Sequence, residues 1–374
     1  MESPRNIQSK PNIIVVGNGA IGRSDSGQRL INKHTGQFLL DLKSRGLKVT
    51  FADWRSAEST AKPLLNFDLG DHGIEYIEVR TRGLPQRLFA LVRLLLRLRS
   101  YDFIYIFFPG RLGQIVGLLS AVLQHKFGLY VRGEQFSRTG VDGLLVRRAA
   151  FSTTVSPALE EILTANGAQA VSVIRPMIDF SLDDLSRKPY AAREKIRFLY
   201  VGRLEERKGV NELIAAFTLL RNRGLDFIEL RLVGSGPLQS HSAIGTDTGV
   251  TCVGQIDETD QLSREYRDAD AFIFASRDEG FPRVVIEAMI HSLPVFARLV
   301  GGMSGYLTDG LNCVGLPASP TGIADCIDEW IQKEDVLNQL SNASFETARS
   351  ILSSKQKHDE LVFDGVNTTL GISK

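Results

Sequence analysis

The sequence has few cysteines and almost no net charge. Its 374 residues include three cysteines, Cys252, Cys313 and Cys326, without the paired spacing of a disulfide framework or a zinc site. No His/Asp cluster has metal-ligand spacing either, so we expect no metal. Lysine and arginine together number 44 against 43 acidic residues. This balance gives no indication of a nucleic-acid partner.

Long apolar runs are also missing. No run reaches the roughly 18 apolar residues that mark a transmembrane helix. The N-terminal segment MESPRNIQSKPN is polar and lacks the apolar core of a signal peptide. We therefore expect a cytoplasmic protein in a reducing compartment.

Short apolar strands alternate regularly with helical patterns along the chain. Repeated βα units without runs of hairpins predict an α/β fold with doubly wound parallel sheets, and the length favours two domains. The polar stretch SLDDLSRKPYAAREKI is the best boundary. We predict an N-terminal domain over residues 1–182, a linker over 183–195 and a C-terminal domain over 196–340. Residues 341–374 should form a C-terminal helix and a tail whose end, DGVNTTLGISK, frays.

The first strand, IIVVGNGAIG, contains a literal dinucleotide fingerprint at Gly17, Gly19 and Gly22. The match is weak, because a polar segment follows where the fingerprint needs a helix, and Asp53 lies 31 residues beyond Gly22 rather than about 20. We favour a glycine-rich loop at the mouth of a domain and expect no NAD binding.

One N-terminal helix is rich in arginine. The stretch from Leu84 to Arg99, LPQRLFALVRLLLRLR, interleaves four arginines with leucines. It can be interpreted as a basic amphipathic surface for anionic lipid or an acidic acceptor. The alternative is a packed helix with arginines at its rim, which we favour because the leucines are dense.

The stretch from Ala271 to Gly302 predicts a strand, a loop, a helix and a second strand. Glu279 lies where the first strand hands over to the helix, which is the ligand crevice of an open parallel sheet. Glu287 lies inside the helix among apolar neighbours, and such a carboxylate usually has a partner. From their chemistry alone, the two glutamates are equally well explained as a site or as an ordinary loop acid and a narrow exposed edge.

Other polar or glycine-rich pieces also follow strands of the second half. Arg203 and Lys208 follow FLYVG and are suited to hold a diphosphate from two sides, although LEERK is also typical of a solvated turn. The VGSGP loop from Val233 follows the next strand, and Gly301 with Gly302 follows PVFAR. Each signal is weak alone, but all fall at carboxyl ends of strands in one domain.

Taken in order, these motifs resemble family 4 retaining glycosyltransferases, which belong to the glycosyl transferases group 1. The matching pieces are GRLEERKG, VGSGP, VGQID, the Glu279-GFPRVVI-Glu287-AM spacing, and VGG followed by DGLNCVGLP. The resemblance covers residues 196 to about 317 closely. It is looser in the N-terminal half, where TTVSPALEEIL and VIRPMIDF resemble the end of the acceptor domain.

The resemblance implies a GT-B fold, two Rossmann-like domains facing across a cleft, with a C-terminal helix, here Phe345 to Leu352, crossing back to the first domain. It implies that Arg203 and Lys208 bind the donor diphosphate, and that Glu279 meets sugar hydroxyls. It marks Arg203, Lys208 and Glu279 as catalytic. The donor-binding residues that it marks are Gly19, Gly234, Gly236, Ile256, Gly280, Phe281, Glu287, Gly301 and Gly302.

Three positions depart from the family pattern. Pro282 follows the phenylalanine of the glutamate motif, where many members have glycine and others proline. Members often carry a histidine where this chain has Arg132-Gly133-Glu134, which makes Arg132 and Glu134 an uncertain first-domain contact. Gly305 stands where the family often has an acid.

The resemblance implies transfer of a hexose from a nucleotide diphosphate sugar, with UDP or GDP as nucleotide, to an acceptor hydroxyl with retention of configuration. No further cofactor is expected. The acceptor would be a saccharide or lipid-linked saccharide of a cell-surface polysaccharide or glycolipid, with peripheral membrane contact through Leu84 to Arg99. Two alternatives stay open: a nucleotide-sugar epimerase of similar fold, and a catalytically weak nucleotide-sugar-binding protein.

Overall fold

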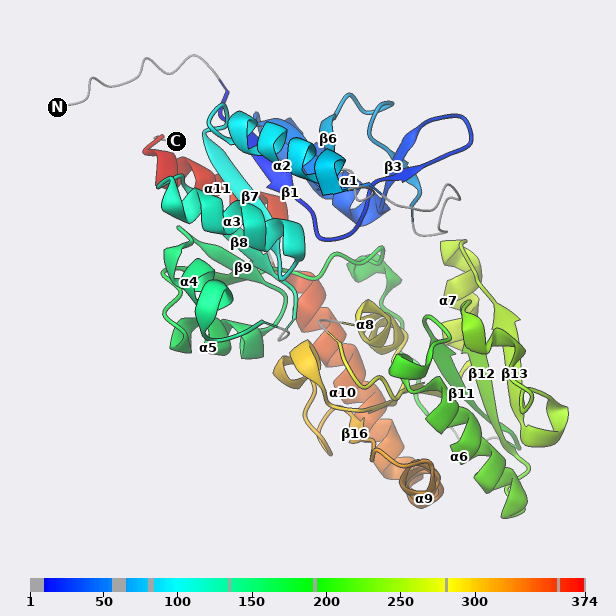
Figure 1. Cartoon of the computed structure of the whole chain (residues 1–374). Helices are drawn as coiled ribbons and strands as arrows, with labels where there is room; N and C mark the ends of the chain where they lie inside the picture. The colour runs from blue at the N-terminus through cyan, green and yellow to red at the C-terminus, as the bar shows by residue number, and fades with distance from the viewer. Residues whose placement is uncertain are drawn as a thin grey trace. The chain divides into compact units, whose positions relative to one another are not determined.

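The chain forms two compact α/β units in a computed structural model (Figure 1). The structure describes residues 10–55, 65–79, 84–133, 136–190, 194–279, 282–354 and 357–372. Unit 1 comprises Met1–Arg175 together with Gln356–Lys374, and unit 2 comprises Pro176–Lys355. Each unit is built on its own parallel sheet, as the strand and helix alternation predicted.

Unit 1 is a seven-stranded parallel sheet with the order β10-β9-β8-β7-β1-β4-β6. Its central strands are buried on both faces, which is why β7, FIYIFF, reads as a continuous apolar run. The chain winds outward from β1 on one side and then from β7 on the other. The strands are β1 (Asn12–Val16), β4 (Lys48–Trp54), β6 (Glu75–Val79), β7 (Phe103–Phe108), β8 (Phe127–Val131), β9 (Ser152–Thr154) and β10 (Val171–Val173).

Helices and a small antiparallel sheet complete unit 1. The small sheet contains β2 (Gly22–Arg23), β3 (Arg29–Ile31) and β5 (Phe67–Asp68). Its strands β2 and β3 lie in the sequence between the glycine-rich loop and the first helix, so that helix begins at Lys33 and not at the glycines. The helices are α1 (Lys33–Ser44), α2 (Leu84–Leu98), α3 (Arg111–Val122), α4 (Gly140–Arg148), α5 (Pro157–Ala165) and α11 (His358–Leu370).

Unit 2 is a six-stranded parallel sheet with the order β13-β12-β11-β14-β15-β16. Its helices cover a core that is continuous from β11 to the end of α10. The strands are β11 (Ile196–Val201), β12 (Ile228–Val233), β13 (Val250–Gly254), β14 (Ala271–Phe274), β15 (Val295–Ala297) and β16 (Val314–Gly315). The α-helices are α6 (Val210–Asn222), α7 (Thr259–Asp268), α8 (Arg283–Ile290), α9 (Pro320–Ile331) and α10 (Glu334–Ser353).

The boundary between the units lies at Arg175–Pro176, earlier than the predicted end of the first domain at 182. The described residues of the predicted linker over 183–195 are in fact part of unit 2, because polar backbone groups among them have hydrogen-bond partners there. The Ser186 amide donates to the Ile290 carbonyl at 3.1 Å, and the Lys188 carbonyl accepts from the Ser341 hydroxyl at 2.7 Å. The polar composition of this segment therefore belongs to a surface segment that is hydrogen-bonded to unit 2, and not to a free linker between domains.

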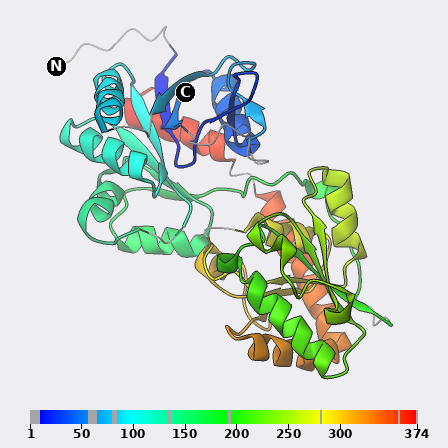
Figure 2. The same cartoon turned by 45° about the vertical axis from the view of Figure 1, so that its right-hand side comes forward.

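The C-terminal region also differs from the prediction. Phe345 to Leu352 lies within α10, which packs on α8 in unit 2, and Figure 2 shows α10 in orange beside the green and yellow elements of that unit. The segment that joins unit 1 is α11. Its end, predicted to fray, is helical to Leu370, because Val362 and Val366 are fully buried one turn apart.

His358, the first residue of α11, lies in the core of unit 1. Its ring stacks on Phe38 with centroids 4.1 Å apart, and its Nε2 lies 2.7 Å from the Tyr105 hydroxyl. Burial, together with a smaller effect of the positive charge of Arg132, lowers the pKa of the His358 imidazole to about 3. The folded protein therefore holds a neutral histidine that the unfolded chain would protonate below its ordinary pKa near 6.5.

Asp53, at the end of β4, titrates in the opposite sense. Only 2% of Asp53 is exposed, and burial raises the pKa of its carboxyl from 3.8 to about 6, although the Trp54 and Gly19 amides that bind it pull the pKa down. Between pH 4 and 6 the folded state holds a proton on Asp53 that the unfolded chain has released. Stability contributed by Asp53 thus falls as the pH rises through this range.

We predict that the contributions of His358 and Asp53 to the pH dependence of stability nearly cancel each other between pH 4 and 6. Because the unfolded state binds the extra proton at His358, this residue should cost about 1.4 kcal/mol of stability per pH unit on acidification. In His358→Gln, stability of unit 1 should therefore fall less steeply with acidification than in the wild type. Asp53→Asn serves as the control of opposite sign, since it should make the acid loss steeper.

The change of the free energy of unfolding of unit 1 with pH can be measured directly by tryptophan fluorescence. The sequence has two tryptophans, Trp54 in unit 1 and Trp330 in unit 2. In a Trp330→Phe background, urea unfolding followed by Trp54 fluorescence reports on unit 1 alone. Equal slopes in the wild type and His358→Gln would contradict the buried neutral histidine.

Candidate functional site

The order of the strands in unit 2 creates a switch point between β11 and β14. Chain connections leave β11 toward β12 on one side and return to β14 on the other. Loops that follow these two strands diverge there, and in open α/β sheets ligands bind at such a point. The loop after β11 carries Arg203 and Lys208, and the loop after β14 carries Glu279.

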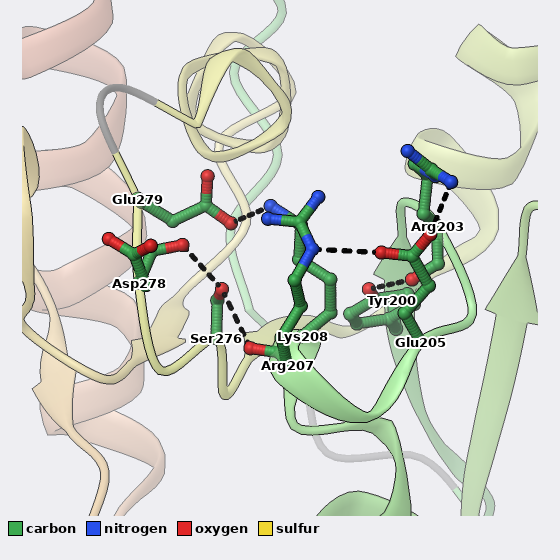
Figure 3. A network of polar contacts seen from close by, with 8 residues as sticks. All are labelled: Tyr200, Arg203, Glu205, Arg207, Lys208, Ser276, Asp278 and Glu279. Carbon is green, nitrogen blue, oxygen red and sulfur yellow. Dashed lines mark hydrogen bonds and ion pairs between the residues drawn. The ribbon is translucent and has the colours of Figure 1, made fainter. Parts of the chain in front are cut away.

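Lys208 and Glu279 form an ion pair across this switch point. The Lys208 Nζ bonds the Glu279 Oε1, and their side chains are 14% and 10% exposed (Figure 3). Two further contacts join the loops: the Arg277 amide donates to the Arg207 carbonyl at 3.0 Å, and the Ser276 hydroxyl lies 3.5 Å from the same oxygen. Residues 71 positions apart in the sequence are thus held together at the edge of one sheet.

Two glycines let the loops after β11 and β15 approach the loop after β14 closely. Gly209, with φ of 73°, ends the 3₁₀ turn η2 (Glu206–Lys208), and a Cβ there would overlap the Ala275 carbonyl at the end of β14. Gly301, with φ of 58°, begins the 3₁₀ turn η5 (Gly301–Gly305), and a Cβ there would overlap the Glu279 carbonyl. Any other residue at either position would force the loops apart.

Arg203 lies in the same loop as Lys208 but has a different partner. Its guanidinium pairs with Glu205 Oε1, and Arg207 Nε donates to Glu205 Oε2 at 2.9 Å. The Arg203 side chain is 58% exposed. The loop therefore presents an exposed guanidinium beside a lysine side chain that is only 14% exposed. Glu205 lies between Arg203 and Arg207 in Figure 3.

Tyr200 supports this loop from below. Its fully buried hydroxyl donates to the Arg203 carbonyl at 2.9 Å. Burial raises the pKa of the Tyr200 phenol well above its usual value, and the nearby carboxylates of Glu279 and Glu205 raise it further. The phenol therefore stays a neutral donor that fixes the backbone at Arg203.

The remaining sequence-predicted residues of unit 2 gather at the same edge of the sheet. Gly234 and Gly236 follow β12, Ile256 follows β13, and Gly301 with Gly302 follows β15. Because parallel strands end at one edge, the structure brings these loops to the side where Lys208 and Glu279 pair. The predicted donor-binding residues Gly280 and Phe281 lie outside the described residues.

Glu287 lies one turn into α8, which begins at Arg283, one residue later than the prediction from Pro282. Pro282 is extended, with ψ of 100°, and precedes the helix. The partner expected for Glu287 is the Tyr266 hydroxyl of α7, which donates to Glu287 Oε2 at 2.9 Å. Sequence reasoning missed Tyr266, although it is the single aromatic residue of a polar helix, TDQLSREYRD.

The corresponding edge of unit 1 carries a second polar cluster. The Gly19 amide donates to Asp53 Oδ2 at 3.0 Å, and the Trp54 amide donates to Oδ1 at 2.7 Å. Arg132, after β8, donates to the Asn18 side chain, and its guanidinium lies 5.5 Å from the centre of the Phe107 ring. Glu134, the other predicted residue of this contact, lies outside the described residues.

The arginine-rich helix α2 is packed on one side only. Leu94 and Leu98 are buried, but Phe89 and Leu96 are 70% and 75% exposed, so the expectation that its dense leucines would all be packed is wrong. Arg93, Arg97 and Arg99 are exposed as well. Among the described residues, no helix combines the length and the apolar character needed to cross a bilayer.

Comparison with known proteins finds similarity mainly in the second unit. Residues 183–347 match the model of the glycosyl transferases group 1. The chain is 31% identical to a glycogen synthase of Mycobacterium tuberculosis over 199 residues, covering 49% of this chain and 45% of that one. It is 30% identical to the putative teichuronic acid biosynthesis glycosyltransferase TuaC of Bacillus subtilis over 152 residues, covering 41% and 37%. The chain thus spans less than half the length of these relatives.

The fold of the whole chain is shared with a solved structure. Anabaena Alr3699/HepE in complex with UDP superimposes with a TM-score of 0.66 at 18% identity, over 97% of this chain and 99% of that one. Two Rossmann-like units with parallel sheets are the GT-B architecture. The chain therefore has the GT-B fold, and its residues 183–347 match the glycosyl transferases group 1.

Proposed function

We propose that this protein is a family 4 retaining glycosyltransferase that transfers a hexose from a nucleotide diphosphate sugar to an acceptor hydroxyl. The observation that carries the proposal is the Lys208–Glu279 pair, held at the switch point of a unit that matches the glycosyl transferases group 1. The relatives named above are themselves a glycogen synthase and a glycosyltransferase. HepE has been solved with UDP and with UDP-glucose, which favours UDP as the nucleotide here.

In this proposal the diphosphate binds between Lys208 and Arg203. Negative charge builds up on the departing phosphate oxygen as the bond to the sugar breaks, and positive charge placed there lowers the barrier. When the donor arrives, Lys208 exchanges its contact with Glu279 for phosphate oxygens. Glu279 then accepts hydrogen bonds from sugar hydroxyls.

The other predicted residues complete the donor site. Glu287 accepts hydrogen bonds from the ribose hydroxyls, and the backbone at Ile256 lies beside the base. The glycine-rich loops let bare backbone approach the phosphates and the sugar closely, although the Gly19 and Gly234 amides themselves already donate to Asp53 and to the Gly254 carbonyl. These residues are Gly19, Gly234, Gly236, Gly280, Phe281, Gly301 and Gly302.

Retention follows from attack on the face that the leaving group vacates. The bond between the anomeric carbon and the phosphate oxygen breaks first, and the sugar passes through an oxocarbenium-like state. The acceptor oxygen then bonds to the same face, and its proton moves to the departing phosphate oxygen. Atoms and charge balance without a protein nucleophile, so Glu279 positions the sugar and is not itself glycosylated.

The acceptor in this proposal is a saccharide or lipid-linked saccharide of a cell-surface polysaccharide or glycolipid. The name of the relative TuaC, a teichuronic acid biosynthesis enzyme, agrees with this class. We also propose that α2 contacts the inner face of a membrane. Its exposed residues Phe89, Val92 and Leu96 follow the i, i+3, i+7 spacing of one helix face, and exposed arginines flank them.

Replacing Lys208 tests the catalytic assignment. In Lys208→Gln we expect the kcat for sugar transfer to fall by about two to three orders of magnitude, as for other groups that stabilise developing negative charge. Rates measured with UDP-glucose or the donor that best stabilises the protein on heating would check this. The matched control is Lys195→Gln. Lys195 immediately precedes β11, on the opposite edge of the sheet, and pairs with Glu229 of β12. A loss of equal size in both variants would contradict the role of Lys208.

One NMR time course separates transfer from the alternative reactions. We expect the anomeric proton of the product to show the same configuration as the donor sugar, and no change of the donor before acceptor is added. Inversion in the product would sink the mechanism above. Conversion of the donor without an acceptor would identify an epimerase, and donor binding without turnover would identify a binding protein.

Sedimentation with lipid vesicles tests the membrane contact. Each arginine near an anionic surface contributes about 1 kcal/mol, so replacing Arg93 and Arg97 by glutamine should weaken binding to phosphatidylglycerol vesicles roughly 30-fold. Phe89→Ser combined with Leu96→Ser should also weaken it. Leu311→Ser, at an apolar side chain of unit 2 that is 66% exposed, is the control and should bind like the wild type. Equal binding to neutral phosphatidylcholine vesicles would argue against the proposed contact.

A further inference from the structure

The carboxylate of Glu287 is held from inside the unit by a buried phenol. Tyr266 of α7 has no exposed surface, and its hydroxyl lies 2.9 Å from Glu287 Oε2 on α8. The same hydroxyl lies 3.4 Å from the Val284 carbonyl, a longer contact on the first turn of α8. A hydrogen bond to a charged oxygen is the stronger of the two. Tyr266 thus links the two helices through the carboxylate that the sequence singled out.

The ring of Tyr266 is itself fixed on both sides. It stacks on the His291 ring with centroids 5.1 Å apart and planes 15° apart, and it packs against Phe272 of β14. His291 Nδ1 lies 2.8 Å from the Glu287 carbonyl, and its Nε2 lies 2.9 Å from the Ser263 hydroxyl of α7. Burial lowers the pKa of His291, so a neutral ring donates from Nδ1 and accepts at Nε2. Tyr266 and His291 therefore both contact Glu287, the first through its carboxylate and the second through its carbonyl.

Tyr266 donates without neutralising the carboxylate. Burial and the charge of Glu287 both raise the pKa of the Tyr266 phenol well above its usual value, so it keeps its proton. A cationic partner in the same place would have cancelled the charge with which a carboxylate accepts from a ligand. A neutral phenol fixes the orientation of Glu287 and leaves its negative charge intact.

We propose that Tyr266 is a positioning residue for the ribose of the donor nucleotide, acting through Glu287. The inference rests on the proposed function, in which Glu287 accepts from the ribose hydroxyls. A free glutamate side chain has three rotatable bonds and loses rotamer entropy when a ligand orders it. The bond from Tyr266 orders the side chain before the ligand arrives, so less affinity is lost on binding.

The test compares a nucleotide with its 2′,3′-dideoxy form. UDP and 2′,3′-dideoxy-UDP, or the GDP pair if GDP stabilises the protein more, are titrated by calorimetry into wild type, Tyr266→Phe and Glu287→Gln. We expect Tyr266→Phe to bind UDP about tenfold more weakly, the effect of losing a hydrogen bond to a charged group. Binding of the dideoxy form should hardly change. In kinetics, KM for the donor should rise and kcat stay, because the ribose contact is the same in ground and transition states.

Two controls separate positioning from packing. Tyr190→Phe removes the hydroxyl of another buried tyrosine of unit 2, one that has no hydrogen-bond partner among the described residues, and should leave UDP binding unchanged. In a Glu287→Gln background, Tyr266→Phe should add little, since the two residues act as one unit.

The outcomes distinguish this inference from the proposed function. If Tyr266→Phe weakens UDP and dideoxy-UDP equally, or weakens neither, the positioning role is overturned while the function stands. If Glu287→Gln leaves the preference for UDP over dideoxy-UDP intact, Glu287 does not bind the ribose hydroxyls. That result would also contradict the positioning role of Tyr266.

Discussion

The Lys208–Glu279 pair is the constraint on which the rest of unit 2 depends. Each side chain is largely withdrawn from water, and taking a charge out of water is costly unless an opposite charge compensates it. The pair can form only if the loops after β11 and β14 meet. That requirement accounts for the left-handed glycine at 209, where a side chain would push these two loops apart, and the left-handed Gly301 likewise lets the loop after β15 approach the backbone of Glu279. The charge pair therefore depends both on the strand order, which brings the loops together, and on glycine at the points of closest approach.

The two units treat a buried carboxylate at the carboxyl edge of the sheet in different ways. In unit 2 the partner of Glu279 is a lysine, which a diphosphate can take over in the proposed reaction. In unit 1 the nearest partners of Asp53 are the Gly19 and Trp54 amides, and these offset only part of its burial, so its pKa stays raised at about 6. Asp53 thus fixes the glycine loop of unit 1, whereas Glu279 holds a partner that can be exchanged.

Much of this arrangement could be predicted from sequence because it depends on local order. Buried parallel strands are continuous apolar runs, and residues that follow them must lie at one edge, so Arg203, Lys208, Glu279 and the glycines could be placed before the fold was known. The hydrogen bond from Tyr266 to Glu287 could not be predicted, because Tyr266 lies in a polar helix and only tertiary packing buries it. For the same reason the helix that returns to unit 1 was predicted too early in the sequence, at Phe345 to Leu352: α11 starts at His358, a polar residue whose burial depends on Phe38 and Tyr105. The predicted linker failed because a polar strap and a free linker have the same composition.

The two glutamates of the motif have partners of different charge, and this difference divides their tasks in the proposed reaction. Glu279 is neutralised by Lys208 until the donor arrives, so an empty site need not hold an uncompensated charge next to the diphosphate position. Once Lys208 contacts the phosphate, it no longer compensates the charge of Glu279. The hydrogen bonds from the sugar hydroxyls to Glu279 can then strengthen as the sugar becomes oxocarbenium-like. Glu287 accepts from the Tyr266 phenol, a neutral donor that can support it before and after binding. Recognition of the ribose is therefore fixed in advance, and only the reacting end of the donor meets a site whose electrostatics change on binding.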